Sequence, residues 1–120
     1  MDIQIPGVDV DSGLDLCDGD LNIYLRVLRA YVSAIPAALE KMQNVTAETL
    51  HNYAINVHGV KSTSTSIGAE ETRKTARQLE IMANDGDLSG VLSLNEPFIK
   101  QTVSLVEGIK SWLEKYDAAL

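Results

Sequence analysis

One stretch of the chain constrains the fold more than any other, because its apolar residues repeat at helical spacing. Between positions 21 and 42 they are separated by alternating steps of four and three. They are Leu21, Leu25, Leu28, Val32, Ile35, Leu39 and Met42. An α-helix turns once in 3.6 residues, so these side chains share one face. The spacing predicts a helix of about 22 residues, capped by Asp18 or Asp20, whose apolar face needs covering by other segments.

Pro36 lies inside this apolar stripe. It cannot donate a hydrogen bond to the carbonyl of Val32, and a proline within a helix bends or breaks it. The apolar spacing continues unchanged beyond Pro36. We therefore expect the helix to bend there rather than to end.

The remaining sequence predicts three further helices and a short one over residues 11–17. The first of the three begins with Thr46 as N-cap and runs to about Ser66, where Gly68 lets the chain turn. The next ends at the turn signal of residues 85–87, and the last opens near Pro97, which suits a first helical turn. The core side of the first of these two helices is expected to hold Thr72, Ala76, Leu79 and Met82. The core side of the last helix is expected to hold Ile99, Val103, Val106, Ile109, Leu113 and Tyr116.

No strand pattern accompanies these helices, so the predicted fold class is all-α. We expect an antiparallel four-helix bundle with a short additional N-terminal helix. A length of 120 residues predicts a single domain over residues 1–120. Within it, residues 1–20 form an acidic segment with the short helix, and residues 21–120 form the bundle.

Charge and composition limit the partners. Residues 1–20 hold six Asp and no Lys or Arg, which argues against nucleic acid and anionic membranes as partners. No apolar run approaches the length of a membrane span, and the first residues lack a signal-peptide pattern. The lone cysteine, Cys17, cannot form an internal disulfide, which suits a reducing compartment. We expect a cytoplasmic, monomeric protein.

His58 is placed unusually for a histidine. On a helical projection it points away from the apolar side and shares its face with His51 and Lys61. An exposed histidine is most often merely solvated, but this position would also present a nucleophilic nitrogen to another macromolecule. His51 and His58 are two helical turns apart, too far to bind one metal ion, so no metal site is expected.

A second polar stripe follows on the next helix, where Arg73, Arg77 and Glu80 are spaced by four and three residues. One interpretation is a solvated face with an ion pair between Arg77 and Glu80. The other requires this helix to pack antiparallel beside the His58 helix. Glu80 could then accept a hydrogen bond from one imidazole nitrogen and leave the other as a nucleophile.

The segment Val57-His58-Gly59-Val60-Lys61-Ser62, followed by Ile67-Gly68-Ala69, resembles the histidine phosphotransfer (HPt) motif. The opening residues 5–10 and the long helix with a central proline also resemble HPt domains of bacterial hybrid histidine kinases. The similarity extends from about residue 5 to residue 116. Ser62 stands where the family usually has glycine, and Gly59 is uncommon beside the histidine.

The resemblance implies a phosphorelay carrier rather than an enzyme. His58 would accept a phosphoryl group from the aspartyl phosphate of one receiver domain and pass it to an aspartate of another. Lys61, Glu80 and Arg77 would support the histidine. The partners would be response-regulator receiver domains and a hybrid histidine kinase. The receiver would supply Mg²⁺, with no cofactor bound by this chain, and would dock on Ile55, Gly59, Ser62 and Thr65.

Three other interpretations remain open. The same fold could be a phosphorylation-inert module that docks receiver or kinase domains. A purely structural helical domain would explain the apolar stripes but not His58. A hydrolase would need an acid–base pair or a metal cluster, and the sequence shows neither.

Overall fold

A computed structural model describes residues 3–120, and these residues are all-helical. The helices are α1 (Val10–Leu16), α2 (Leu21–Lys41), α3 (Leu50–Ile67), α4 (Glu70–Asn84) and α5 (Leu88–Ala119). The described residues contain an isolated bridge between Ile5 and Val8 but no strand. The predicted all-α class is therefore confirmed.

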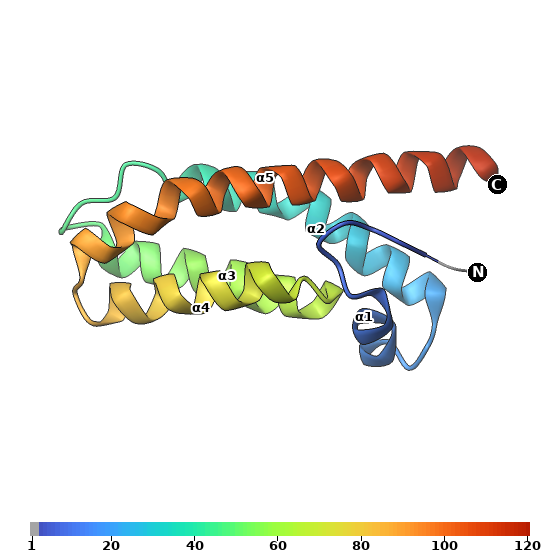
Figure 1. Ribbon diagram of the computed structural model, residues 1–120, viewed down its shortest axis with the longest axis horizontal. Coiled ribbons are helices and arrows are strands. Elements are labelled where there is room, and N and C mark those ends of the chain that lie inside the picture. Colours follow the sequence, from blue (N-terminus) through green and yellow to red (C-terminus); the bar gives the residue numbers. More distant parts are fainter. Residues whose placement is uncertain (1–2) are drawn as a thin grey trace.

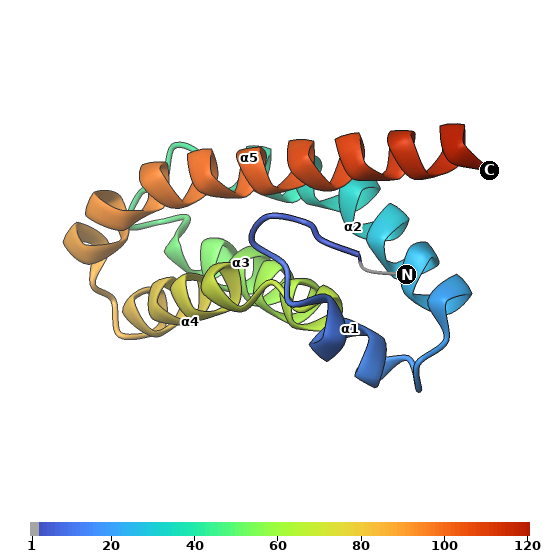
Figure 2. The same ribbon diagram turned by 45° about the vertical axis from the view of Figure 1, so that its right-hand side comes forward.

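The four longer helices run back and forth along the molecule, as the colours of Figure 1 show. Helix α2 packs against α3 and α5, and α4 packs against α3 and α5. The α3–α4 contact is the most extensive of these. Helix α1 lies next to the turn between α3 and α4, and it contacts α2 and α3 (Figure 2).

Helix α2 follows the apolar stripe closely. The Asp20 side chain accepts a hydrogen bond from the backbone N–H of Ile23, so Asp20 is the N-cap. The helix continues through Pro36 to Lys41, as predicted. Most of the stripe is buried, and Leu21 and Val32 are partly buried.

The start of α3 differs from the prediction. The helix begins at Leu50, whereas Thr46 caps the turn that precedes it. There the backbone N–H of Thr46 donates to the hydroxyl of Thr49, and the N–H of Thr49 donates to the hydroxyl of Thr46. This reciprocal pair satisfies the same backbone donors that a helix cap would satisfy.

The turn between α3 and α4 depends on Gly68. Its φ of 84° is in the left-handed region, as expected for a residue that ends a helix. Its carbonyl accepts a hydrogen bond from the N–H of Asp9, and a Cβ at Gly68 would fall against the Asp9 carbonyl. Close approach of the N-terminal segment thus adds a second reason for glycine here.

The last helix begins earlier than predicted. Asp87 caps α5 by accepting from the N–H of Gly90, so the helix opens at Leu88 and Pro97 lies inside it. Pro97 leaves the carbonyl of Ser93 without its helical donor, but both residues are exposed, so water can satisfy that carbonyl. One residue expected on the core side, Val103, is exposed, whereas Met82, Ile99 and Tyr116 are partly buried against the core.

Candidate functional site

Helix α3 has one side in the core and one side in solvent. The inward side carries residues at helical spacing that are all buried: Leu50, Tyr53, Val57, Val60, Ser64 and Ile67. The outward side carries His58, whose side chain is 58% exposed. Near the end of α3, the hydroxyls of Thr63, Thr65 and Ser66 donate to carbonyls four residues earlier. Packing of the inward side keeps this serine- and threonine-rich stretch helical.

Close packing of α3 on α4 brings Glu80 beside His58. The Nδ1 atom of His58 lies 2.5 Å from Oε2 of Glu80. The Nζ atom of Lys61 donates to the other carboxylate oxygen, Oε1, also at 2.5 Å. Glu80 therefore joins two residues of the neighbouring helix, one through each of its oxygens.

The surroundings of Glu80 favour its charged form. Partial burial raises the pKa of its carboxyl, but the hydrogen bonds from Lys61 and His58 outweigh burial and hold that pKa below the ordinary value. A carboxylate can only accept hydrogen bonds, so Nδ1 of His58 must carry the donated proton. In a neutral imidazole this leaves the lone pair on Nε2.

Arg77 is not part of this arrangement. Its side chain is exposed, and within residues 3–120 it forms no ion pair with Glu80. The Arg77–Glu80 ion pair of the first interpretation is therefore not formed among these residues, and Glu80 pairs with Lys61 and His58 instead. Arg73 instead pairs with Glu70 one turn earlier on α4, at 2.9 Å.

The four residues predicted to dock a partner are all exposed on α3: Ile55, Gly59, Ser62 and Thr65. Ile55 is a large apolar side chain and is 59% exposed. Apart from its chain neighbours and the backbone of its own helix, Gly59 has no atom within 4 Å of where a Cβ would stand, so the surface beside His58 is open. Gly59, Ser62 and Thr65 are small residues, and with the exposed Ile55 they share the solvent-facing side of α3 with His58.

Several buried polar contacts were not predicted from the sequence. The hydroxyl of Tyr31 shares a 2.9 Å hydrogen bond with that of Ser64, and Tyr24 donates to the carbonyl of Ile67. Both contacts tie α2 to the half of α3 that follows His58. The available signal was the spacing of Tyr24, Leu28, Tyr31 and Ile35, which continues the helical pattern of α2.

A third buried contact links α3, α5 and the end of α2. Tyr53 donates to Oδ1 of Asn95 at 2.7 Å, and the Asn95 amide donates to the carbonyl of Met42 at 2.8 Å. Asn95 stands just before Pro97, where the sequence predicts that the last helix opens. It lies instead inside α5 and satisfies a carbonyl at the end of α2.

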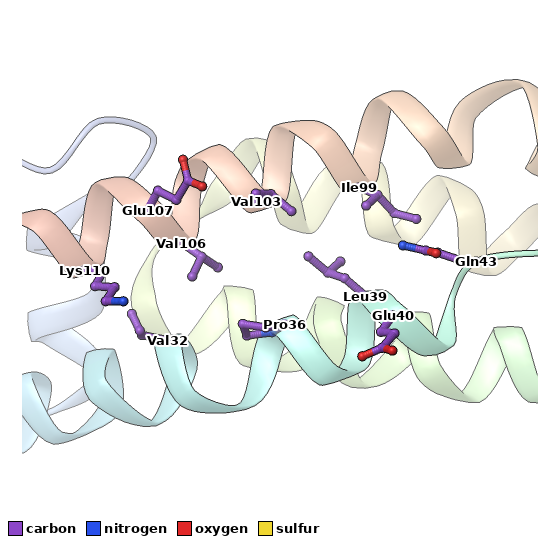
Figure 3. Close-up of a pocket in the computed structure, with 10 residues that line it drawn as sticks. All are labelled: Val32, Pro36, Leu39, Glu40, Gln43, Ile99, Val103, Val106, Glu107 and Lys110. Carbon is purple, nitrogen blue, oxygen red and sulfur yellow. The ribbon is translucent and has the colours of Figure 1, made fainter.

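A groove of about 530 Å³ lies between α2 and α5, away from the histidine (Figure 3). Val32, Leu39 and Val106 give it an apolar lining, with Glu40 and Glu107 among its charged residues. No residue of α3 or α4 lines it, so the groove is separate from the surface around His58.

No helix in the described part of the chain is long and apolar enough to cross a membrane. Within residues 3–120, no three His, Cys, Asp or Glu side chains are grouped so as to hold a metal ion. Comparison with models of protein families, with curated proteins and with solved structures returned no match. The function must therefore be inferred from the site itself.

Proposed function

We propose that this chain is a phosphorelay carrier with the fold of an antiparallel four-helix bundle. His58 accepts a phosphoryl group from the aspartyl phosphate of one receiver domain and passes it to the aspartate of another receiver domain. The chain acts as a carrier, because its partner supplies the Mg²⁺ and the acidic pocket. The proposal follows the resemblance of residues 57–69 to the HPt motif.

The observation that carries this proposal is the hydrogen bond between His58 and Glu80. An exposed histidine without partners would be solvated on both nitrogens and would have no fixed orientation. Here Nδ1 is held by a carboxylate, while the ring remains 58% exposed. This combination gives an oriented nucleophile that a second protein can reach.

The transfer step uses the Nε2 lone pair of His58. It attacks phosphorus in the partner's aspartyl phosphate, the bond from phosphorus to the carboxyl oxygen breaks, and the aspartate leaves as a carboxylate. The ring keeps its proton on Nδ1 and becomes positively charged when Nε2 bonds to phosphorus. Glu80 faces that proton and stabilises the new charge. Transfer to the next receiver is the reverse of this step.

Local charge also suits an acidic partner. The chain carries a net charge of −7, but residues 51–78 hold Lys61, Arg73, Lys74 and Arg77 against only two glutamates. A local positive excess favours approach of a receiver's acidic pocket. Arg77, which forms no ion pair within the described residues, is free to meet that partner.

Label transfer from phosphorylated receivers tests the proposal. The wild-type chain, His51→Gln and His58→Gln are incubated with a panel of receivers that carry a radioactive aspartyl phosphate. His51 is the matched control, since it is exposed on the same helix. Label should appear on the wild type and on His51→Gln but not on His58→Gln, and it should be lost in acid and stable in base. Equal labelling of His58→Gln would overturn the assignment.

The same panel separates a carrier from an inert docking module. An inert module would bind receivers with similar affinity before and after His58→Gln, and neither chain would take up label. Calorimetric titration of the unphosphorylated receivers, run beside the labelling, gives the affinity. Binding without labelling across the panel would favour the docking module.

A further inference from the structure

The ammonium group of Lys61 is already occupied in the unphosphorylated protein. Lys61 follows His58 by three residues on α3, and its Nζ lies 2.5 Å from Oε1 of Glu80. Its side chain is only 25% exposed, because the aliphatic stem lies against the protein. Lys61 is therefore directed at Glu80 and not outward over the imidazole.

Glu80 is in turn held at both ends. Its side chain is 15% exposed, with Oε2 on His58 and Oε1 on Lys61. Rotation of the carboxylate would break one of these charge-assisted hydrogen bonds. Loss of Lys61 would leave Glu80 with one partner and free to rotate or to take a proton.

We propose that Lys61 is a positioning residue that acts through Glu80, whose carboxylate it orients against Nδ1 of His58. Lys61 thereby selects the tautomer that leaves the Nε2 lone pair facing solvent. This inference deepens the proposed function and rests on it for its biological meaning. The tautomer itself is a property of the free protein and needs no phosphoryl donor.

Ring-nitrogen NMR measures the tautomer directly. Spectra of ¹⁵N-histidine-labelled protein are recorded near pH 8.5, about two units above the pKa of an ordinary histidine. The wild type should carry its proton mainly on Nδ1. Lys61→Met, which keeps an unbranched side chain without the charge, should raise the share of the Nε2–H tautomer by about threefold to tenfold, the scale of one typical hydrogen bond.

Lys74→Met is the matched control, because Lys74 also pairs with a glutamate on α4. Its partner is Glu71, with 3.6 Å between Nζ and Oε1, and not the Glu80 that holds His58. It should leave the His58 spectrum unchanged. Lys61→Gln provides a second variant in case Lys61→Met fails to fold. An unchanged tautomer in a folded Lys61 variant would overturn the inference.

A double-mutant cycle distinguishes action through Glu80 from direct action on the phosphoryl group. In a Glu80→Gln background, Lys61→Met should change neither the tautomer nor the transfer rate further. An equal fall in transfer rate in both backgrounds would mean that Lys61 acts on the phosphoryl group itself, and would overturn the inference. If no receiver labels the wild type, the proposed function fails, yet the NMR comparison still decides the role of Lys61.

Discussion

His58 and Glu80 are separated by 22 residues in the chain, yet Nδ1 of one lies 2.5 Å from Oε2 of the other. Their helices, α3 and α4, are joined by a turn at Gly68 and Ala69. The turn sets the register in which the two helices pack, and that register places the carboxylate beside the imidazole. Changes at Glu80 and in the surface near His58 should therefore have separable effects on stability and on transfer.

Glu80→Ala should slow phosphoryl transfer to His58 by about tenfold, the effect of losing one hydrogen bond to a charged group. It should also lower the free energy of unfolding by about 1 kcal/mol or more, since Lys61 is left partly buried without a partner. Glu80→Gln keeps an amide oxygen that can accept from Nδ1 and should retain more of the rate. Transfer assays and urea unfolding measure the two effects. Equal rates for Glu80→Ala and wild type would make Glu80 structural.

Gly59→Ala should stabilise the protein but impair docking. Gly59 lies within α3, and a Cβ there would meet nothing within 4 Å beyond its chain neighbours and its own helical backbone. Alanine should therefore add about 1 kcal/mol to the free energy of unfolding. If a receiver covers this surface, the added methyl group should weaken its binding.

Two other glycines provide the controls for Gly59. Gly108→Ala in α5, with equally open surroundings, should stabilise the protein without affecting transfer. Gly68→Ala should destabilise it, because a φ of 84° and the Asp9 carbonyl both disfavour a side chain. Melting temperatures and receiver affinities are the measurements. Unchanged affinity in Gly59→Ala would place docking elsewhere.

Tyr53→Phe should lower the free energy of unfolding by about 1–2 kcal/mol, because the buried Oδ1 of Asn95 loses its donor. Tyr116→Phe serves as a control. Tyr116 is partly buried, and its ring stacks on that of Trp112 with 5.2 Å between the ring centroids. Its hydroxyl has no hydrogen bond to any described residue. That variant should change stability by less than about 0.5 kcal/mol. Similar losses in both variants would show that the Tyr53–Asn95 contact contributes nothing specific.

Stability should fall steeply in alkali. Burial raises the pKa of Tyr24 and of Tyr31 to about 12, and burial also raises the pKa of Tyr53. The unfolded chain ionises near the ordinary tyrosine value of about 10, so it binds fewer protons than the folded chain above that pH. The contribution of the protonated tyrosines to the free energy of unfolding is complete below about pH 10. It is lost as the pH rises towards about 12, and the free energy of unfolding falls by about 1 kcal/mol per pH unit for each tyrosine.

Urea unfolding at several pH values tests this alkaline loss. Tyr31→Phe should give a shallower dependence on pH than the wild type, because one ionising group is removed. Identical slopes for the two proteins would mean that Tyr31 ionises alike in the folded and unfolded chains.

Local patterns were enough to predict some features of the fold. The alternating steps of three and four residues from Leu21 to Met42 predicted α2, because a helix that buries one face needs apolar residues at that spacing. The start of α5 was missed, because Pro97 looked like a first-turn residue while Asp87 is the actual cap. Proline is compatible with both a helix start and an exposed helix interior, and only packing of the preceding turns decides between them.

The candidate site divides in the same way. The sequence by itself determined that His58 faces outward, because the apolar residues of α3 lie on the side opposite His58 and that side packs into the core. It also placed Lys61 one turn after His58. Only the tertiary structure decided that Glu80 is shared by His58 and Lys61 and that Arg77 is excluded. Those contacts depend on the register between two packed helices, which the turn at Gly68 and the buried side chains fix together and which no local pattern encodes.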